Sequence, residues 1–282
     1  MIRGAVAASA ILSLSQLMGG VLVPLEAIPR DVSELKGARC VAEKLSPYLV
    51  DGSTSGSAAA DPWKDDWNTI AVSQIHFAYD ESASAVIRNA SLQIERGKKY
   101  VIIGRSGSGK STLAKILAGL CPARFSLTVD GRSADPSALF PHVSYMDQHA
   151  FLFHDTIYQN ISLSREISRE KVREMLDKMQ FAKAAAPGEN ILNVGVGEGG
   201  AQLSGGEKQR IALARELIVR KDILILDEYT SALDPETAKA LDELVLGLSG
   251  VTCLLITHQL DSLLLKRCDA VYSLEEGKLI EI

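Results

Sequence analysis

The sequence predicts an α/β fold, in which helices cover a largely parallel sheet. Three short and largely apolar runs, at residues 99–103, 223–226 and 251–256, lack the polar–apolar alternation of half-exposed strands. Continuous runs of this length are typical of parallel strands that are buried on both faces. Apolar residues at helical spacing follow the first run, over residues 112–120, and precede the second, over residues 208–219.

The loop after the first run matches the phosphate-loop pattern G-x-x-x-x-G-K-[ST] in full. Its glycines allow the backbone amides to curve around phosphate groups. We expect Lys110 to reach the β- and γ-phosphates and the Ser111 hydroxyl to bind Mg²⁺. A flexible Gly-Ser turn is the alternative, which the strand before and the helix after disfavour. The nucleotide-binding residues predicted here are Gly104, Arg105, Ser106, Gly107, Ser108, Gly109, Lys110, Ser111 and Thr112.

Two carboxylates, Asp227 and Glu228, end the second apolar run. Open α/β sheets bind ligands at the carboxyl ends of their strands. We expect Asp227 to hold Mg²⁺, directly or through water, and Glu228 to position or deprotonate the attacking water. The alternative is a pair of solvated acids at a strand end, which the phosphate loop upstream disfavours.

The third apolar run ends at Thr257 and His258. A single histidine is more often structural than catalytic. This one leaves a buried strand at the same predicted sheet edge as Lys110 and Glu228, and we therefore expect it to contact the γ-phosphate. The other histidines have no comparable placement.

A helix N-cap is predicted at Ser204, which is followed by Gly205, Gly206 and Glu207. Serine and glutamate at this spacing form a capping box, in which each side chain satisfies the other residue's amide. A glycine-rich helix start also exposes amide donors and a partial positive charge, which suits phosphate. Taken alone, the segment is equally well explained as an ordinary capped helix.

Together these motifs resemble the ATP-binding cassette family, and specifically the nucleotide-binding domain of an exporter-type transporter. The resemblance covers residues 69–282. It implies the P-loop NTPase cassette fold, with a mixed sheet core, an antiparallel β subdomain and a helical subdomain. Residues 164–186 carry the helical pattern that the family uses to receive its membrane domain, although a plain surface helix explains that pattern equally well.

The resemblance also assigns roles to residues outside the phosphate loop. Tyr79 falls where the family stacks an aromatic ring on adenine, and Gln148 falls where it contacts Mg²⁺ and couples to the membrane domain. Residues 204–206 would face the phosphate loop of a second cassette, and residues 231–234 would cross the interface. The resemblance thus implies ATP and Mg²⁺ as cofactors and a homo- or heterodimer with head-to-tail cassettes. The catalytic residues predicted are Lys110, Gln148, Glu228 and His258, and the predicted metal ligands are Ser111, Gln148 and Asp227.

Two positions depart from the family pattern. Glu207 stands where the family more often has glutamine, and the capping box makes a glutamate acceptable there. The chain also stops at Ile282, where many relatives continue into another helix. Every nucleotide motif lies upstream of that point, so we expect catalysis to survive.

Near the N-terminus, residues 4–25 carry no formal charge, and we expect a transmembrane helix over residues 4–28. A cleaved signal peptide and a buried soluble helix are the alternatives; export would separate the phosphate loop from cytoplasmic ATP. Basic residues on the C-terminal side favour a cytoplasmic location for the cassette, at an inner or cell membrane. Residues 1–50 are then a remnant of an exporter's transmembrane domain, and residues 51–68 are a linker. We expect the chain to be a fragment, with Met1 an internal start.

Composition narrows the alternatives. The net charge of −5 over 282 residues offers no basic field for nucleic acid. The four cysteines are scattered without metal or redox spacing. A soluble cassette ATPase of DNA repair would carry long coiled coils between the phosphate loop and Ser204, and residues 111–203 leave no room for them. A non-hydrolysing regulatory module is the other alternative, against which Glu228 and His258 argue.

Overall fold

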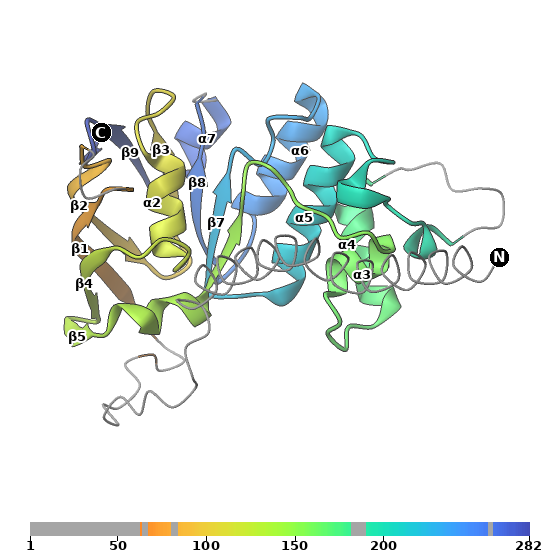
Figure 1. Ribbon diagram of the computed structural model, residues 1–282, viewed down its shortest axis with the longest axis horizontal. Helices are drawn as coiled ribbons and strands as arrows, with labels where there is room; N and C mark the ends of the chain where they lie inside the picture. The colour runs from red at the N-terminus through yellow and green to blue at the C-terminus, as the bar shows by residue number, and fades with distance from the viewer. Residues whose placement is uncertain (1–62, 64–66, 80–83, 182–189, 259–261) are drawn as a thin grey trace, which may run out of the picture. The chain divides into compact units, whose positions relative to one another are not determined.

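Two sheets frame the described part of this computed structural model, which comprises residues 63, 67–79, 84–181, 190–258 and 262–282 (Figure 1). The first sheet has four antiparallel strands in the order β2-β1-β4-β5. The second has six strands in the order β10-β9-β3-β8-β7-β6, in which β10 runs antiparallel to β9 and the others pair in parallel. The strands of the first sheet are β1 (Thr69–Phe77), β2 (Ile87–Glu95), β4 (Arg124–Val129) and β5 (Arg132–Ala134). Those of the second are β3 (Lys99–Ile103), β6 (Val143–Met146), β7 (Ile223–Asp227), β8 (Thr252–Ile256), β9 (Ala270–Glu275) and β10 (Lys278–Glu281).

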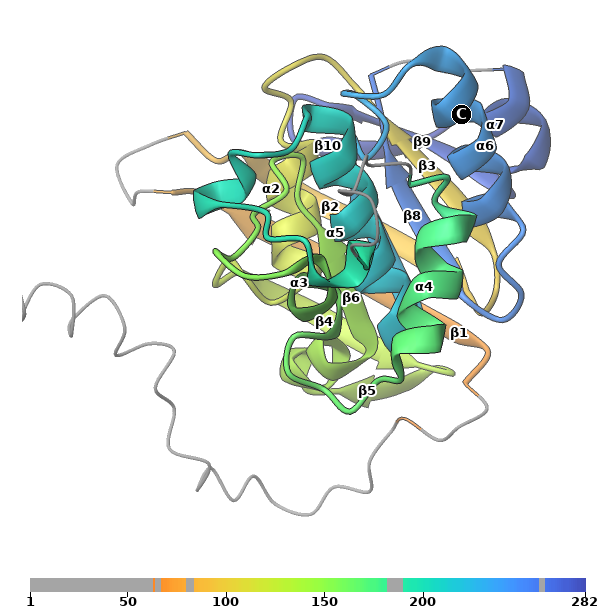
Figure 2. The same cartoon turned by 90° about the vertical axis from the view of Figure 1, so that its right-hand side faces the viewer.

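The helices cover both faces of the six-stranded sheet. Figure 1 shows α2 and the four-stranded sheet on one side of it and α3 to α6 on the other. The view from the helical side shows α4 and α5 next to each other (Figure 2). The α-helices are α2 (Lys110–Leu117), α3 (Ile157–Ser162), α4 (Arg169–Lys178), α5 (Gly205–Val219), α6 (Pro235–Leu246) and α7 (Ser262–Arg267). Short 3₁₀ helices lie at Pro136–His142, Ile191–Asn193 and Glu198–Gly200.

The central strands β7 and β8 of the second sheet are buried on both faces, because each face packs into a different core. In β7, Ile223 and Ile225 join the core shared with α2 and the four-stranded sheet. Leu224 and Leu226 join the core shared with the helices. Full burial of one such side chain contributes about 1.5–3 kcal/mol. This period-two division explains why the sequence shows continuous apolar runs, and the predicted fold class is confirmed.

Two helices begin or end at other residues than the sequence indicated. α2 starts at Lys110 and ends before Gly119, whose φ of 76° closes the helix in a left-handed turn. α4 begins only at Arg169, because Ser168 is extended and its side chain caps the helix by accepting from the Lys171 amide; Leu163 and Ser164, with φ values of 48° and 60°, also lie outside the helical region. Helical spacing cannot locate such ends, since they depend on single backbone angles.

Most of the expected N-terminal features lie outside the described residues. These are the transmembrane helix at residues 4–28, the remnant domain at residues 1–50 and most of the linker. Among the described helices, none has both the length and the apolar character needed to cross a bilayer. Two residues of the expected linker, Trp63 and Trp67, are buried in the core that contains α2. Packing in the cassette thus begins before the expected boundary at residue 69.

A buried lysine lies at the start of β3, at the opposite end of the strand from the phosphate loop. Lys99 is 5% exposed, and its Nζ donates to three carbonyl oxygens, of Gly97 at 3.0 Å, Leu248 at 2.9 Å and Val251 at 2.6 Å. These bonds join β3 to the turn that precedes β8. Buried carbonyls without donors are costly, so this ammonium holds the register of the two strands.

We predict that Lys99→Met lowers the free energy of unfolding by about 2–4 kcal/mol, because three partly buried carbonyl oxygens lose their donor. Urea unfolding followed by tryptophan fluorescence measures this, since both tryptophans of the chain are buried in the cassette. Lys98→Met is the matched control. Lys98 is exposed and forms only long ion pairs, at 3.6 and 3.5 Å, so its removal should leave the midpoint close to the parent's. Equal midpoints for the two variants would contradict the role given to Lys99.

Candidate functional site

The phosphate loop lies between β3 and α2 and takes its shape from glycine. Gly104 has φ 154°, and a Cβ there would lie 2.7 Å from the Leu274 carbonyl oxygen of β9. Gly109 has φ 101° and precedes the first residue of α2 with no side-chain cap. The first amides of α2 are therefore open to a ligand, and a helix start of this kind attracts anions.

Lys110, the first residue of α2, is buried with its ammonium directed back along the loop. Nζ donates to the carbonyl oxygens of Gly104 at 2.9 Å and Arg105 at 3.0 Å, and it lies 3.4 Å from His258 Nδ1. Burial lowers the pKa of Lys110, and the nearby carboxylates of Glu228 and Asp227 oppose that effect. The two carbonyls hold the charge in a position that a phosphate group can share.

His258 connects Lys110 to Glu228. Its Nε2 contacts Glu228 Oε1, and the other carboxylate oxygen accepts from Gln148 Nε2 at 2.5 Å. An ammonium can only donate, so Nδ1 is the acceptor for Lys110 and the ring proton lies on Nε2, facing Glu228. The Glu228 side chain is 11% exposed and the His258 side chain 42%. The carboxylate is thus fixed from two sides at the edge of a buried site.

The backbone at Glu228 is unusual. Its φ is 48°, in the left-handed region that few residues other than glycine adopt, and its amide donates to the Ile256 carbonyl at 3.0 Å. Strain of this kind costs on the order of 1 kcal/mol and persists only where neighbouring bonds enforce it. The turn directs the carboxylate toward His258 and Gln148, away from the axis of β7.

Asp227 ends β7 and is fully buried, and neither carboxylate oxygen has a hydrogen-bond partner of good geometry. Burial raises the pKa of Asp227; the neighbouring Ser111 hydroxyl lowers it and the Glu228 carboxylate raises it further. Unpaired buried carboxylate oxygens fit a cation that needs oxygen ligands, as Mg²⁺ does. No group of three His, Cys, Asp or Glu side chains within the described residues has the arrangement of a metal site.

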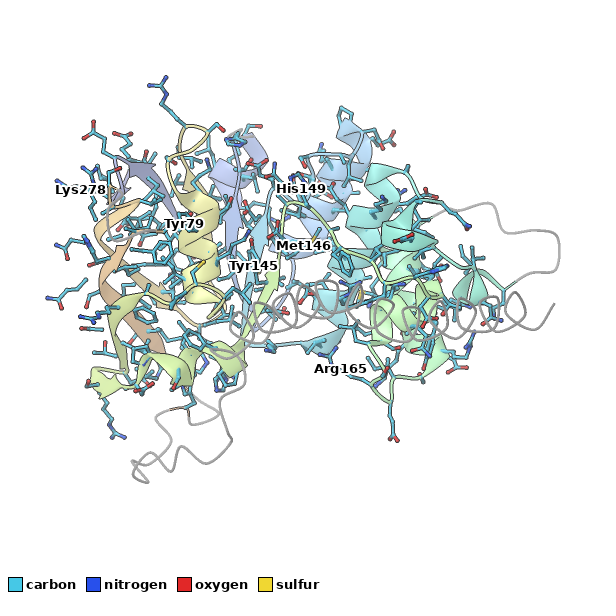
Figure 3. The ribbon with its side chains drawn as sticks, viewed as in Figure 1. Tyr79, Tyr145, Met146, His149, Arg165 and Lys278 are labelled. Atoms are coloured by element: carbon cyan, nitrogen blue, oxygen red, sulfur yellow. The ribbon has the colours of Figure 1, made fainter. Side chains whose placement is uncertain are left out.

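Tyr79 stands beside the start of α2. Its hydroxyl is 2.9 Å from Thr112 Oγ1, its ring is 65% exposed, and Phe77 packs edge-on against it at 4.9 Å. Figure 3 shows Tyr79 next to α2, on the opposite side of that helix from Tyr145 and Met146 of β6. A large exposed ring fixed at both ends offers a flat surface for a planar ligand.

The Ser204 segment forms the predicted capping box. The Ser204 amide donates to Glu207 Oε2 at 2.7 Å, and the Glu207 amide donates to Ser204 Oγ at 3.2 Å. Within the described residues, Gly205 and Gly206 pack against Ala232 and Leu233 rather than against the phosphate loop. The structure thus brings together Lys110, His258, Glu228 and Gln148, and it places the Ser204 segment elsewhere on the same chain.

Two side-chain contacts near Glu228 and Gln148 are not indicated by any sequence motif. Gln209 of α5 is 4% exposed and bonds to the turn after Glu228. Lys115 of α2 pairs with Asp147, next to Gln148, at 2.9 Å. Both residues look like ordinary surface positions in the sequence, because a polar residue in an amphipathic helix is usually exposed. The one signal in the sequence is proximity: Lys115 lies shortly after the phosphate loop, and Gln209 lies shortly after the Ser204 segment.

Two hollows flank the cluster. One of about 400 Å³ is lined by Glu228, His258, Ser231 and Lys239, among others. Another, of about 690 Å³, lies beside Gly104, Arg105 and Ser108 of the phosphate loop and also reaches His258. The cluster is therefore open on two sides, and its residues are accessible to a ligand that contacts the phosphate loop.

A strand, a glycine loop and a helix that begins with a buried lysine define the P-loop class of nucleotide-binding proteins, and the acidic end of a neighbouring strand completes the pattern. Comparison with known families gives the narrower class. The family model described as ABC transporter matches residues 87–231. The chain therefore belongs to the ABC transporter family.

Known relatives are exporters and transport ATPases. The ATP-dependent lipid A-core flippase of Vibrio vulnificus is 33% identical over 277 residues, which cover 94% of this chain and 46% of that protein. The glutathione/L-cysteine transport system ATP-binding/permease protein CydC of Haemophilus influenzae is 34% identical over 219 residues, which cover 75% of this chain and 38% of that protein. The chain thus spans about half the length of the curated relatives it matches, or less.

A solved structure of a bacterial Atm1-family ABC exporter with ATP bound superposes with a TM-score of 0.69 at 30% identity, over 78% of this chain and 39% of that one. The resemblance to an exporter-type nucleotide-binding domain is therefore confirmed. Domains of this class hydrolyse ATP to power transport.

We predict that Asp227→Asn stabilises the protein in the absence of nucleotide and Mg²⁺, by about 1–3 kcal/mol at pH 7, because it removes a buried charge that its neighbours compensate only in part. The folded pKa of Asp227 is raised above its ordinary 3.8, so the parent loses stability as the pH rises through that window. The advantage of the variant should accordingly shrink as the pH falls. Urea unfolding at several pH values measures it.

The control for this comparison is Glu174→Gln, which removes an exposed carboxylate from α4. It should leave the midpoint nearly unchanged at every pH. If Asp227→Asn were destabilising at pH 7, the carboxylate would have a partner and the case for a cation there would weaken.

Proposed function

We propose that this chain is the ATP-hydrolysing part of an exporter and acts with a second cassette. The observation that carries the proposal is the single cluster formed by Lys110, His258, Glu228 and Gln148 at the end of the phosphate loop. A nucleotide-binding protein that only sensed ATP would not need a nearly buried carboxylate fixed by two hydrogen-bonding side chains. Such a carboxylate suits a general base.

Binding of ATP follows from the loop. The backbone amides of residues 105–112, with the side chains of Ser106 and Ser108 near them, would surround the phosphates, and Lys110 would neutralise them. Tyr79 would stack on adenine, since its ring is exposed while Thr112 holds its hydroxyl. Burial lowers the pKa of Lys110, and the negative charge of a bound triphosphate would act in the opposite direction and favour the charged ammonium.

Asp227, Ser111 and Gln148 would hold Mg²⁺. The unpaired oxygens of Asp227 and the adjacent Ser111 hydroxyl supply the support for this assignment. When bound, Mg²⁺ neutralises charge that develops on the phosphate oxygens during transfer. The proton transfer and the positioning of the water depend on side chains of the protein.

In the hydrolysis step, Glu228 would accept a proton from a water molecule as the water oxygen bonds to the γ-phosphorus. The bond from that phosphorus to the β–γ bridging oxygen would break, so that ADP and phosphate leave, and the proton on Glu228 would pass to phosphate or water as they do. Gln148 and His258 each occupy one carboxylate oxygen and so restrict its rotation. His258 also reaches Lys110, which places its ring beside the expected γ-phosphate position. Geometry of this kind lowers the entropic cost of bringing water, base and phosphate together.

The exposed start of α5 supports a two-chain site. Ser204, Gly205 and Gly206 form a capped, glycine-rich helix start, and the two glycines lie against Ala232 and Leu233 of their own chain rather than against its phosphate loop. A second cassette placed head-to-tail, identical or not, would bring them to its phosphate loop. Residues 69–282 would then be the cytoplasmic cassette, joined through residues 51–68 to a transmembrane domain represented by residues 1–50, at an inner or cell membrane.

We predict that Glu228→Gln lowers ATP turnover at least 100-fold while leaving the affinity for ATP within a factor of a few, because the amide cannot accept the proton. Phosphate release at saturating Mg·ATP measures turnover, and a ribose-labelled fluorescent ATP measures binding. Glu236→Gln, at an exposed position in the first turn of α6, is the control. Equal rates for the parent and Glu228→Gln would remove Glu228 from the catalytic role.

We also predict that Ser204→Arg abolishes ATP-dependent dimerisation and turnover, while Lys110 still binds ATP on each chain. The long cation would occupy the space needed by the partner's phosphate loop and would remove the cap. Light scattering with the Glu228→Gln background measures dimerisation, since that variant holds ATP unhydrolysed. Ser204→Thr is the control because it retains the capping hydroxyl. Normal turnover in Ser204→Arg would reduce the segment to a helix cap.

A further inference from the structure

Gln209 is a buried carboxamide that uses both of its ends. It lies on α5, little more than one turn after Ser204, and is 4% exposed. Its Nε2 donates to Ser231 Oγ at 2.9 Å and, less directly, to the Glu228 carbonyl at 3.4 Å; its Oε1 accepts from the Ala232 amide at 3.0 Å. A glutamine supplies a donor and an acceptor together, which neither glutamate nor methionine does.

All three partners belong to one turn, residues 228–233, which begins with the left-handed Glu228. Inside the turn, the Ser231 amide also donates to the Glu228 carbonyl, at 3.1 Å. The Glu228 carbonyl thus accepts from both the turn and Gln209. Because the φ of Glu228 is strained, the direction of its carboxylate depends on bonds that hold the turn, and Gln209 supplies them from outside it.

The start of α5 lies unusually close to the same turn. A Cβ on Gly205 would be 3.2 Å from Ala232 Cβ, and one on Gly206 would be 3.0 Å from Leu233 Cδ2. A side chain at either glycine would be crowded unless the turn moved by a few tenths of an ångström, and this close approach brings Gln209 within reach of the turn. Helix and turn therefore form one rigid contact, with packing at the helix start and hydrogen bonds one turn later.

From this contact we infer that Gln209 is a positioning residue for Glu228 of its own chain, although the start of the same helix serves the partner's nucleotide. This inference rests on the proposed two-chain site. It has a mechanical consequence: engagement of the start of α5 by the partner's nucleotide is transmitted through Gln209 to the turn that aims Glu228. The Glu228 carboxylate of each chain would thus reach its catalytic position only when nucleotide is bound at the partner's phosphate loop.

The test uses two differently tagged copies of the full chain, purified together as a mixed dimer. The active copy keeps Glu228, and the inactive copy carries Glu228→Gln, so hydrolysis occurs only at the active copy's phosphate loop. That site is completed by the inactive copy's α5. Gln209→Met, which preserves side-chain length but removes both hydrogen-bonding ends, is then introduced into one copy or the other.

We expect turnover at saturating Mg·ATP to be at least tenfold lower with Gln209→Met in the active copy than with it in the inactive copy. The opposite order would mean that Gln209 shapes the phosphate-binding helix start for the partner, and equal rates would mean that it has no positioning role. Either result overturns the inference. Binding of the ribose-labelled fluorescent ATP to each copy, with parental affinity, verifies that the phosphate-loop site is folded.

A second measurement does not depend on turnover. Hydrogen exchange of the Ala232 amide, the donor to Gln209, should be about tenfold faster in the nucleotide-free Gln209→Met chain. Gln159→Met, at an exposed glutamine of α3, is the control and should exchange there as the parent does. Unchanged exchange in Gln209→Met overturns the inference. Parental mixed dimers without any turnover, together with faster exchange, would instead contradict the proposed function.

Discussion

The parallel pairing of β3, β8 and β7 is the constraint on which the site depends. Ile102 pairs with Ile256, and Ile256 pairs with Asp227, so three strand ends arrive at one sheet edge in register. Phosphate loop, acidic turn and His258 each begin where one of these strands stops. A shift of one residue would turn the apolar side chains of a strand toward the wrong core and carry its last residue away from the cluster. The two cores therefore enforce the geometry of the site.

This sheet edge carries buried charges and a strained residue that do not stabilise the fold. Lys110 and Asp227 are both buried, burial lowers the pKa of one and raises that of the other, and Asp227 has unpaired oxygens. Buried charges without full compensation destabilise a protein unless a ligand supplies the missing partners. The left-handed Glu228 adds backbone strain. Stability is thus reduced where nucleotide and cation would restore it, which is a common property of functional sites.

Much of the fold was predictable because periodicity reports burial. The runs at 223–226 and 251–256 and the helix after Ser204 were found at nearly their observed positions. Ends were less predictable: α4 is shorter than its pattern, since left-handed residues precede it. Trp63 and Trp67 looked like part of a polar linker, and their burial arises from a core assembled from distant segments. Gln209 was missed for the same reason, because a buried polar side chain has no periodic signature.

By itself, the sequence determined the local chemistry: which loop can surround phosphates, which carboxylates end a buried strand, and which serine caps a glycine-rich helix start. Each of these follows from local spacing, since turn shape, strand burial and helix capping involve residues near one another in the chain. Only the tertiary structure decided which groups meet. The contact of Lys110 with His258, the two hydrogen-bonding partners of the Glu228 carboxylate and the attachment of Gln209 to its turn join residues from different elements. Such contacts depend on strand register and on the packing of α5, neither of which any local pattern contains.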